Sequence, residues 1–443
     1  MRDRLKRDGD TAPPAPGFWT LAGVEGWERF AIHGTKSLLT LFLLTDLLAR
    51  PALPVAGLAM LRSGIEGVTG TTTDLAFASQ LYGLYGALTY LVLPLGGWIA
   101  DRGQRRRPAM YVGAALMAAG MVALASRQGA LIGLALMIAG IGLLKGNLAA
   151  EVGALRGRRV SERLFAAYLA FLNGGAMLGP LLGGWLAARM GFATAFAAMA
   201  GSMIVAMLLL RTAPRVAPAA SPVGGDRRVD WARVIPAIVA VTLCFCAYEQ
   251  LSNIVLVWAK ARVELSVHGF AIPPSWLIAA DGLFTIILAL AAYRLWPRLA
   301  TRGAEPSSGI KLALGGVAIM LAYGVLALLS AGGSAASGRI GLGGPLAAIL
   351  LLDIGVVLAW PAALAIVTTA APPARRGTMT GLFYLHGFVA HLAVGQLGTL
   401  YPGMSQPGFW MIHAALALMG AAVALLIPRG QAMTTSTAAS AAA

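Results

Sequence analysis

The sequence predicts an all-α membrane protein in which twelve transmembrane helices form two six-helix bundles. Three observations support this fold class. The 443-residue chain is 58% hydrophobic and only 12% charged, whereas soluble domains average about 25% charged residues. Apolar runs long enough to span a bilayer recur along the chain, and one long polar linker divides them into two equal sets. The abundant glycine suits close-packed transmembrane helices, because small residues let backbones approach.

Each predicted span holds about 20 mostly apolar residues, the length that crosses the hydrocarbon core of a bilayer. In chain order the spans cover residues 18–48, 74–100, 108–126, 130–152, 163–187, 191–211, 232–259, 274–296, 309–331, 343–370, 377–401 and 407–428. Cys244 and Cys246 stand one residue apart in an apolar run. They are expected to fill the core rather than to form a disulfide or a zinc site.

The segment 212–230, TAPRVAPAASPVGGDRRVD, is the only long stretch rich in Pro, Gly and Arg. It separates the chain into two halves of six spans. Halves of this kind are typical of transporters that bind cargo between them near the bilayer midplane. The expected parts are a cytoplasmic tail (1–15), a first bundle (16–211), the cytoplasmic linker (212–230), a second bundle (231–430) and a disordered tail (431–443).

Basic residues predict the orientation of the spans. They gather before the first span and after the second, fourth, sixth, eighth and tenth, which places all of them on one side. The positive-inside rule identifies that side as the cytoplasm, so both termini are expected there, in the inner membrane of the cell. We find no signal-peptide pattern at the start of the chain. The net charge of +16 therefore reflects topology and does not predict nucleic-acid binding.

The first span carries an unusual set of charges in GVEGWERFAIHGTK, residues 23–36. On a helix, Glu25, Arg29 and Lys36 lie within about 40° of one another, and Glu28 lies about 60° to the other side of Glu25. Charges inside a bilayer usually pair with each other and face a water-filled cavity. Snorkelling to the interface can explain Glu25. It fits poorly for Lys36, which stands about 16 Å further along the helix.

Other spans carry isolated polar residues that could meet this stripe. For any one of them, a hydrogen bond inside the bundle is an equally good interpretation. Together they predict a polar interior with charges of both signs, which suits a zwitterionic or charged cargo and proton coupling. They are Tyr82, Tyr85, Tyr90, Lys145, Asn173, Glu249, Gln250, Asp281 and Asp353.

Several segments between residues 25 and 385 follow one another in the order of a known family. Glu25-Gly-Trp-Glu28-Arg29 resembles an E-x-x-E-R motif of helix one. The other segments are PLGGWIADRGQRRR, GIGLLKGN, FLNGGAMLGPLLGGWL, YEQ, IPPSWLIAADGLF and LAIVTTAAPPARRGTMTGLFYL. The ordered set resembles the proton-dependent oligopeptide transporters of the major facilitator superfamily, and its order is more specific than any single motif.

This resemblance implies a major facilitator fold, alternating access and inward symport with protons. It implies that Glu25, Glu28 and Arg29 form a proton-coupling cluster that pairs with Lys145, and that Glu249 gates the cavity through a proton-sensitive salt bridge. The proton gradient would supply the energy, and no cofactor or metal is expected. Many bacterial members carry two further helices between the bundles, and the linker of this chain is too short for them.

The chain departs from the family where the carboxylate of a peptide would bind. Lys36 stands in place of an Arg, which keeps the charge but loses the two-pronged hydrogen bonding of a guanidinium. The two tyrosines that usually follow the E-x-x-E-R motif are Ile32 and His33. His33 is a substrate-binding candidate, and His33 and His386 are pH-switch candidates by residue type, although a single His is more often structural.

The chain also departs where the amino group of a peptide would bind. The helix-ten Glu of the family aligns with Val356, and a small residue near it aligns with Trp360. Asp281 replaces a helix-eight Asn, and Phe383 replaces a helix-eleven Trp. We hypothesise that Asp281 has taken over cation recognition and that Trp360 has reshaped the pocket. Asp353 would be a poor direct substitute, because it lies about 60° from the Val356 position.

The leading interpretation is a monomeric, proton-coupled symporter that imports di- or tripeptides or a related small zwitterion or amine. Two alternatives keep the fold: specialisation for a non-peptide cargo, and efflux of a peptide-like natural product or drug. A substrate-binding sensor that does not transport is a further alternative. An intramembrane enzyme is disfavoured, because the five histidines form no H-E-x-x-H motif and no G-x-S-x-G motif occurs.

Overall fold

The computed structural model describes residues 17–70, 73–103, 106–156, 162–213, 228–332, 339–372 and 375–428. The predicted tails, 1–15 and 431–443, lie outside the described residues, as does most of the predicted linker 212–230. The described chain is almost entirely helical, with one short β-hairpin made of β1 (Ser266–Val267) and β2 (Phe270–Ala271).

The first half contains six long helical segments that agree with the predicted spans within a few residues. The first segment continues from α2 into a π-helical turn, η1 (Leu43–Leu47). The six are α2 (Phe18–Phe42), α4 (Asp74–Gly103), α5 (Arg106–Ala125), α6 (Ala130–Arg156), α7 (Glu162–Met190) and α8 (Phe192–Thr212).

The second half contains six further segments, and its first span is interrupted. There α9 (Trp231–Tyr248) ends in a 3₁₀ turn, η2 (Glu249–Ser252), before α10 (Ile254–Arg262) continues. The remaining elements are α11 (Trp276–Thr301), α12 (Ser308–Ala331), α13 (Gly343–Thr369), α14 (Arg376–Gly398), η4 (Tyr401–Gly403) and α15 (Gln406–Leu425).

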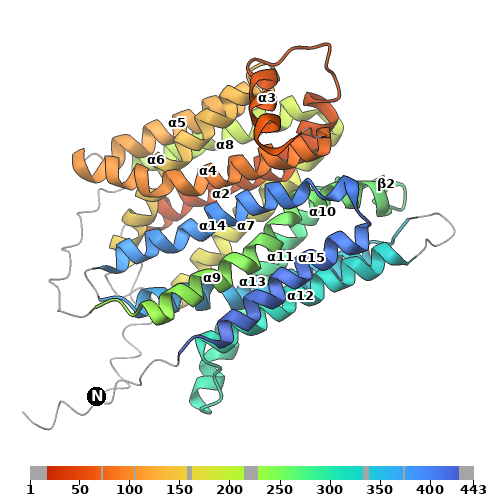
Figure 1. Cartoon of the computed structure of the whole chain (residues 1–443). Helices are drawn as coiled ribbons and strands as arrows, with labels where there is room; N and C mark the ends of the chain where they lie inside the picture. The colour runs from red at the N-terminus through yellow and green to blue at the C-terminus, as the bar shows by residue number, and fades with distance from the viewer. Residues whose placement is uncertain are drawn as a thin grey trace, which may run out of the picture.

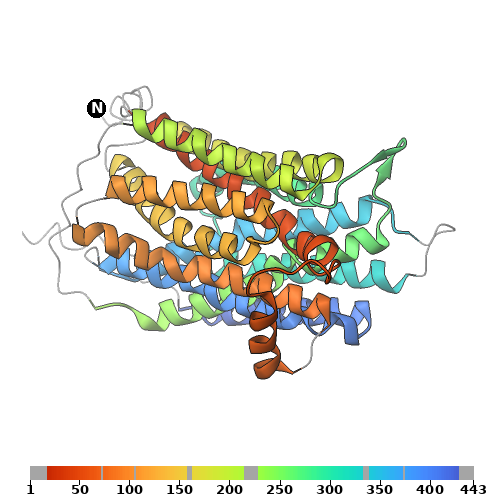
Figure 2. The same ribbon diagram turned by 90° about the horizontal axis from the view of Figure 1, so that it is seen from above.

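One helix was not predicted. The segment α3 (Leu58–Thr69) follows the first span and runs across the direction of the spans (Figure 2). Arg62 ties it to the start of α4 through an ion pair with Asp74, at 2.7 Å between Nη1 and Oδ1. Hydrogen bonds to Glu66 and Asp74 raise the pKa of Arg62.

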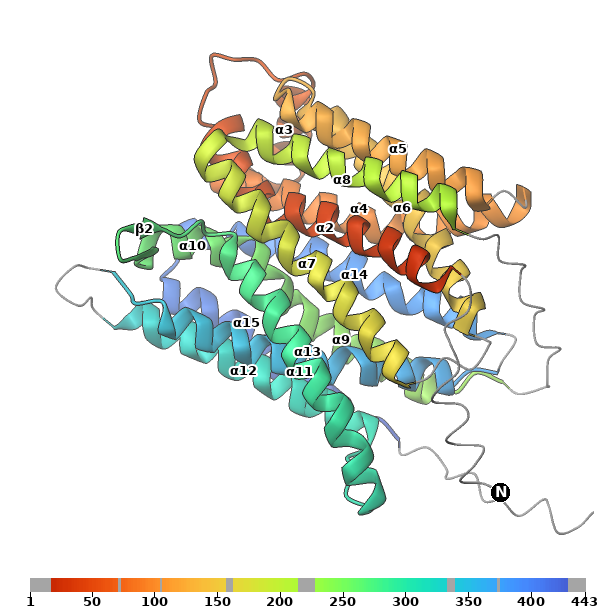
Figure 3. The ribbon, with the colours of Figure 1, turned by 180° about the vertical axis from the view of Figure 1, so that it is seen from behind.

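The two halves form separate helical groups that meet along two seams. In Figure 1 the helices of the first half occupy the upper part and those of the second half the lower part. One seam joins α4 to α14, and the other joins α7 to α11, which lie side by side in Figure 3 as well. The arrangement confirms the predicted fold class of two six-helix bundles.

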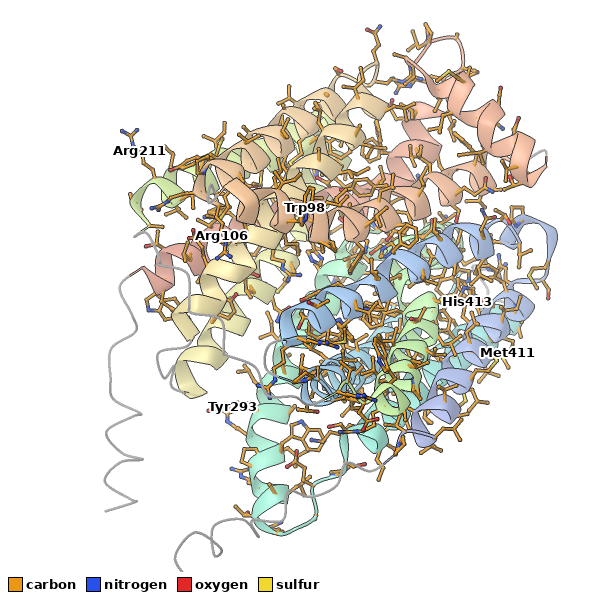
Figure 4. The ribbon with its side chains drawn as sticks, turned by 60° about the vertical axis from the view of Figure 1, so that its left-hand side comes forward. Trp98, Arg106, Arg211, Tyr293, Met411 and His413 are labelled. Atoms are coloured by element: carbon orange, nitrogen blue, oxygen red, sulfur yellow. The ribbon has the colours of Figure 1, made fainter. Side chains whose placement is uncertain are left out.

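Nine of the described helices are long and apolar enough to cross a membrane by themselves. The helix α2 is not among them, since it carries the charged stripe. The nine cover Asp74–Ile99, Arg106–Ala125, Ala130–Leu148, Phe192–Thr212, Trp231–Ser252, Trp276–Thr301, Ser308–Ala331, Gly343–Thr369 and Gln406–Leu425. Arg106 and Arg211 lie at the same end of their bundle (Figure 4), as the predicted alternation of basic loops requires.

Glycines allow the two bundles to touch along the seams. A Cβ atom added to Gly83 in α4 would stand 2.5 Å from the carbonyl oxygen of His391 in α14. A Cβ added to Gly282 in α11 would stand 2.9 Å from the Cα of Met177 in α7. These contacts lie in the first halves of α4 and α11, and both helices begin on the side opposite the start of α2 and the end of α15. The tight part of the interface is therefore remote from the two ends of the described chain.

Candidate functional site

Two carboxylates and two cations form a partly buried cluster around α2, which we call the α2 cluster (Glu25, Glu28, Arg29 and Lys145). Glu28 is fully buried, and its Oε1 lies 3.2 Å from Nζ of Lys145 in α6. Nε of Arg29 lies 3.9 Å from Oε2 of Glu28, and Nη2 of Arg29 lies 4.0 Å from Oε1 of Glu25. The charges sum to zero, which offsets the cost of removing each of them from water.

The sequence builds this cluster by packing α2 tightly against α7. Gly175 and Gly179 in α7 abut the carbonyl oxygens of Gly26 and Phe30, and a Cβ atom at either glycine would overlap them. The close approach brings the hydroxyl of Tyr168 to Glu25, to which it donates a hydrogen bond. Glu25 is thus held by a neutral donor from α7 and by a cation from its own helix.

A second ion pair crosses between the bundles. Nζ of Lys36 in α2 donates to Oε2 of Glu249 in η2 at 2.6 Å, and both side chains are mostly buried. The Lys36 ammonium also stands 5.9 Å from the centroid of the Tyr82 ring. The same Glu249 oxygen lies 3.5 Å from Nε2 of His391 in α14. One carboxylate oxygen is therefore shared by a cation of the first bundle and a histidine of the second.

A small cavity of about 50 Å³ opens beside this ion pair, between residues of both bundles. Its wall carries a cation and two carboxylates, and only Leu251 and Ile278 among its lining residues are apolar, so it can contact both ends of a small dipolar molecule. Its walls are formed by His33, Lys36, Tyr248, Glu249, Leu251, Ser252, Ile278 and Asp281.

Asp281 in the cavity wall belongs to a pair of carboxyl groups. Tyr248 donates a hydrogen bond to its Oδ1 at 2.8 Å, and its carboxyl group lies beside that of Asp353 in α13. Asp353 is fully buried and accepts a hydrogen bond from Thr285 at 2.9 Å, while its Oδ2 has no donor among the described residues. Two carboxylates in contact cannot both ionise at low cost, so a shared proton suits the pair.

The interruption after α9 carries a polar network that ties the bundles together. Nδ2 of Asn253 donates to Oγ of Ser79 in α4 at 2.7 Å, and Oδ1 of Asn253 accepts from Thr40 in α2 at 3.2 Å. Gln250 donates to the carbonyl of Val394 in α14 at 3.1 Å. Because the chain is not α-helical from Glu249 to Asn253, the side chains of this interruption can reach α2, α4 and α14.

The predicted site residues divide into three groups in the structure. Glu25, Glu28, Arg29 and Lys145 lie together in the α2 cluster, and His33, Lys36, Glu249 and Asp281 line the cavity. The others do not line it in this conformation. Of these, Trp360 packs against Phe383 at 5.7 Å between ring centroids. The full group outside the lining is Tyr82, Tyr85, Asn173, Gln250, Trp360 and Phe383.

Four polar residues at the site were not predicted as site residues from the sequence: Tyr168, Tyr248, Ser252 and His391. Each is a polar residue within or next to an apolar span, so the reasoning that selected Tyr82 and Asn173 could have selected them too. His391 had a further signal, because it is the second His in the apolar segment HGFVAHLAVG.

Comparison with known proteins identifies the family. The model of the Major Facilitator Superfamily matches residues 38–395. The chain belongs to this superfamily. It is also 24% identical to a di-/tripeptide transporter of Lactococcus lactis subsp. cremoris, over 93% of this chain and 95% of the relative. It is 26% identical to the peptide transporter YePEPT of Yersinia enterocolitica, over 84% and 85% of the two chains.

Solved structures show the same fold. A crystal structure of the peptide transporter POT in complex with sulfate superposes with a TM-score of 0.77 at 21% identity, over 95% of this chain and 97% of that one. A POT family transporter in complex with 5-aminolevulinic acid gives a TM-score of 0.74 at 19% identity, over 93% and 95%. This major facilitator protein is therefore a transporter related to the POT peptide transporters, and not an enzyme.

Proposed function

We propose that this transporter is a proton-coupled symporter that imports di- or tripeptides, or a related small molecule with an amino group, across the inner membrane. The observation that carries the proposal is the cavity between the bundles, in which Lys36 and Asp281 offer opposite charges from opposite bundles. A cargo with a carboxylate and an ammonium group can pair with both residues at once. The peptide transporters among the relatives support this cargo class.

Lys36 must leave Glu249 before it can bind a cargo carboxylate. In the structure Nζ of Lys36 lies 2.6 Å from Oε2 of Glu249, so Lys36 is occupied. A proton that weakens this pair releases Lys36 to the cavity. Cargo binding and proton binding then favour each other, because each satisfies a charge that the other leaves unpaired.

The α2 cluster is the second place where a proton can act. Glu28 is held by Lys145 from α6 and by Arg29 from its own helix. A proton on Glu28 would loosen both contacts. Movement of one net positive charge inward gains about 2.3 kcal/mol per 100 mV of membrane potential, so excess protons favour import.

The seams between the bundles support alternating access. The glycine contacts of α4 with α14 and of α7 with α11 close the half of the interface that is remote from the start of α2 and the end of α15. With both termini in the cytoplasm, as the basic loops predict, this closed half faces outward. Rocking of one bundle against the other would open it.

Uptake into liposomes tests the proposal. The purified protein should accumulate labelled dialanine when an inward proton gradient is applied, and a protonophore should abolish the accumulation. Protein-free liposomes are the control for leakage. Lack of accumulation by folded, monodisperse protein would reject dialanine-type cargo and redirect the search to amines and modified amino acids.

A further inference from the structure

His391 is held rigidly at the seam between α4 and α14. Its side chain is 1% exposed, and its ring lies against Gly86, where a Cβ atom would overlap it. The ring also packs on Tyr90, at 5.3 Å between centroids. Nδ1 lies 2.9 Å from the carbonyl oxygen of Gly387 one turn earlier in α14. A carbonyl oxygen only accepts, so Nδ1 must carry a hydrogen.

This hydrogen bond determines what the other ring nitrogen can do. In the neutral ring, Nε2 presents a lone pair, and it faces Oε2 of Glu249 at 3.5 Å. Two acceptors facing each other in a buried site are unfavourable. A proton on Nε2 converts the contact into a charge-assisted hydrogen bond. The geometry therefore has room for one proton between His391 and Glu249.

The charged and titratable groups around His391 come from several elements. Glu249 approaches from η2 and Lys36 from α2. Tyr82 and Tyr90 approach from α4, and His386 lies on the same helix. The nearby helix α13 packs on α14 through Trp360. The acid of α13, Asp353, instead accepts a hydrogen bond from Thr285 and lies beside Asp281. Glu249 is thus the carboxylate that contacts the ring of His391.

We propose that His391 is the residue that binds the coupling proton at the ion pair between the bundles. The inference rests on the proposed function and specifies how the proton acts there. Before protonation, Lys36 pairs with Glu249 and His391 is neutral. After protonation, cationic His391 donates to Glu249, and Lys36 is free to pair with a cargo carboxylate. Every charge has a partner in both states once the cargo is bound.

The exchange also alters the contact between the bundles. Lys36 belongs to the first bundle, whereas Glu249 and His391 both belong to the second. Protonation of His391 therefore replaces an ion pair that crosses the interface by one that lies within the second bundle. The proton would loosen the closed half of the carrier while the cargo site becomes available.

The test compares H391Q with a matched control, H413Q. Glutamine keeps an N–H group that can donate to Glu249, but it cannot carry the proton. His413 is also fully buried in the second bundle (Figure 4), and its Nδ1 lies 2.8 Å from the carbonyl oxygen of Phe409 one turn earlier. No ion pair involves its Nε2 in the described part of the chain.

Two measurements decide the proposal. The first is the affinity for dialanine as a function of pH. In the pH range where His391 takes up its proton, the affinity of the wild type should rise up to about tenfold for each unit that the pH falls, because one proton is bound together with the cargo. H391Q should lose this dependence, and H413Q should keep it. The second is NMR of the histidine ring nitrogens in isotope-labelled protein in liposomes, without cargo. The signal of His391 is assigned by its absence from the spectrum of H391Q, and it should show the ring becoming charged as the pH falls.

The outcomes separate this proposal from the proposed function. If H391Q keeps the wild-type pH dependence, or if the His391 ring stays neutral throughout the range in which binding depends on pH, the assignment is wrong. If dialanine binds to no variant at any pH, the proposed cargo class fails. In that case the cargo-free NMR titration still decides whether His391 takes up the proton, by whether its ring becomes charged between pH 8 and pH 5.

Discussion

Glu28 is the fully buried member of the α2 cluster, so its charge is the most sensitive to loss of a partner. Conversion to E28Q leaves Lys145, whose side chain is 26% exposed, without a full counter-charge. Breaking a fully buried pair typically costs about 3–5 kcal/mol, and the partial exposure of Lys145 lowers this cost. We expect a lower melting temperature and loss of protonophore-sensitive dialanine accumulation, with some counterflow retained.

E25Q is the comparison for this prediction, because the Glu25 side chain is 12% exposed and also has Tyr168 as a donor. It should lose coupled accumulation but retain more stability than E28Q. The double variant E28Q/K145Q should recover part of the melting temperature, since it removes both charges. Normal accumulation by both single variants would show that the α2 cluster does not couple protons.

Asp281 permits a second prediction at the residue scale. If Asp281 binds the ammonium group of the cargo, D281N should lower dialanine uptake at least tenfold. The melting temperature of D281N should stay close to that of the wild type, because Asn can still accept the hydrogen bond from Tyr248. D46N is the control, because Asp46 pairs with Arg127 within the first bundle and does not line the cavity. Undiminished dialanine uptake by D281N would remove Asp281 from the site.

At the scale of the helices, α4 and α14 offer a prediction about packing. G83A places a Cβ atom 2.5 Å from a backbone oxygen of His391, which cannot rotate away. The seam must widen, so we expect slower transport and a lower melting temperature. G97A is the matched control in the same helix, because a Cβ atom there would meet no atom within 4 Å. Equal effects of the two substitutions would contradict the importance of this contact.

The helices themselves were largely predictable, because bilayer thickness sets the length of each apolar run. The helix α3 was not, because it is short and does not span. The contacts between helices were harder to predict from the sequence than the helices themselves. Lys36 and Glu249 are 213 residues apart, and no pattern in either span indicates that they meet. No sequence pattern indicates that Asp281 and Asp353 meet either. The 3₁₀ turn at η2 was a further obstacle, because it points side chains in directions that an ideal helix would not give them.

At the scale of the whole molecule, the ion pair of Lys36 and Glu249 should stabilise the closed contact between the bundles. E249Q removes the charge that holds Lys36, and the closed half of the interface should then open more often. Ser275 reports this opening, since it is 1% exposed and donates to the carbonyl of Pro180 across the α7–α11 seam. The rate at which a membrane-impermeant thiol reagent labels S275C measures the exposure. The native Cys244 and Cys246 are buried, so the background should be low.

We expect S275C to be labelled several-fold faster in E249Q than in the parent. A tenfold increase would correspond to a shift of about 1.4 kcal/mol in the equilibrium between closed and open forms. D46N is the control, because Asp46 pairs with Arg127 at 3.2 Å within the first bundle and so should leave the labelling rate unchanged. If S275C is labelled at the parental rate in both E249Q and D46N, the ion pair does not hold the bundles together. The glycine contacts at the α4–α14 and α7–α11 seams and the polar network at η2 must then stabilise the closed form.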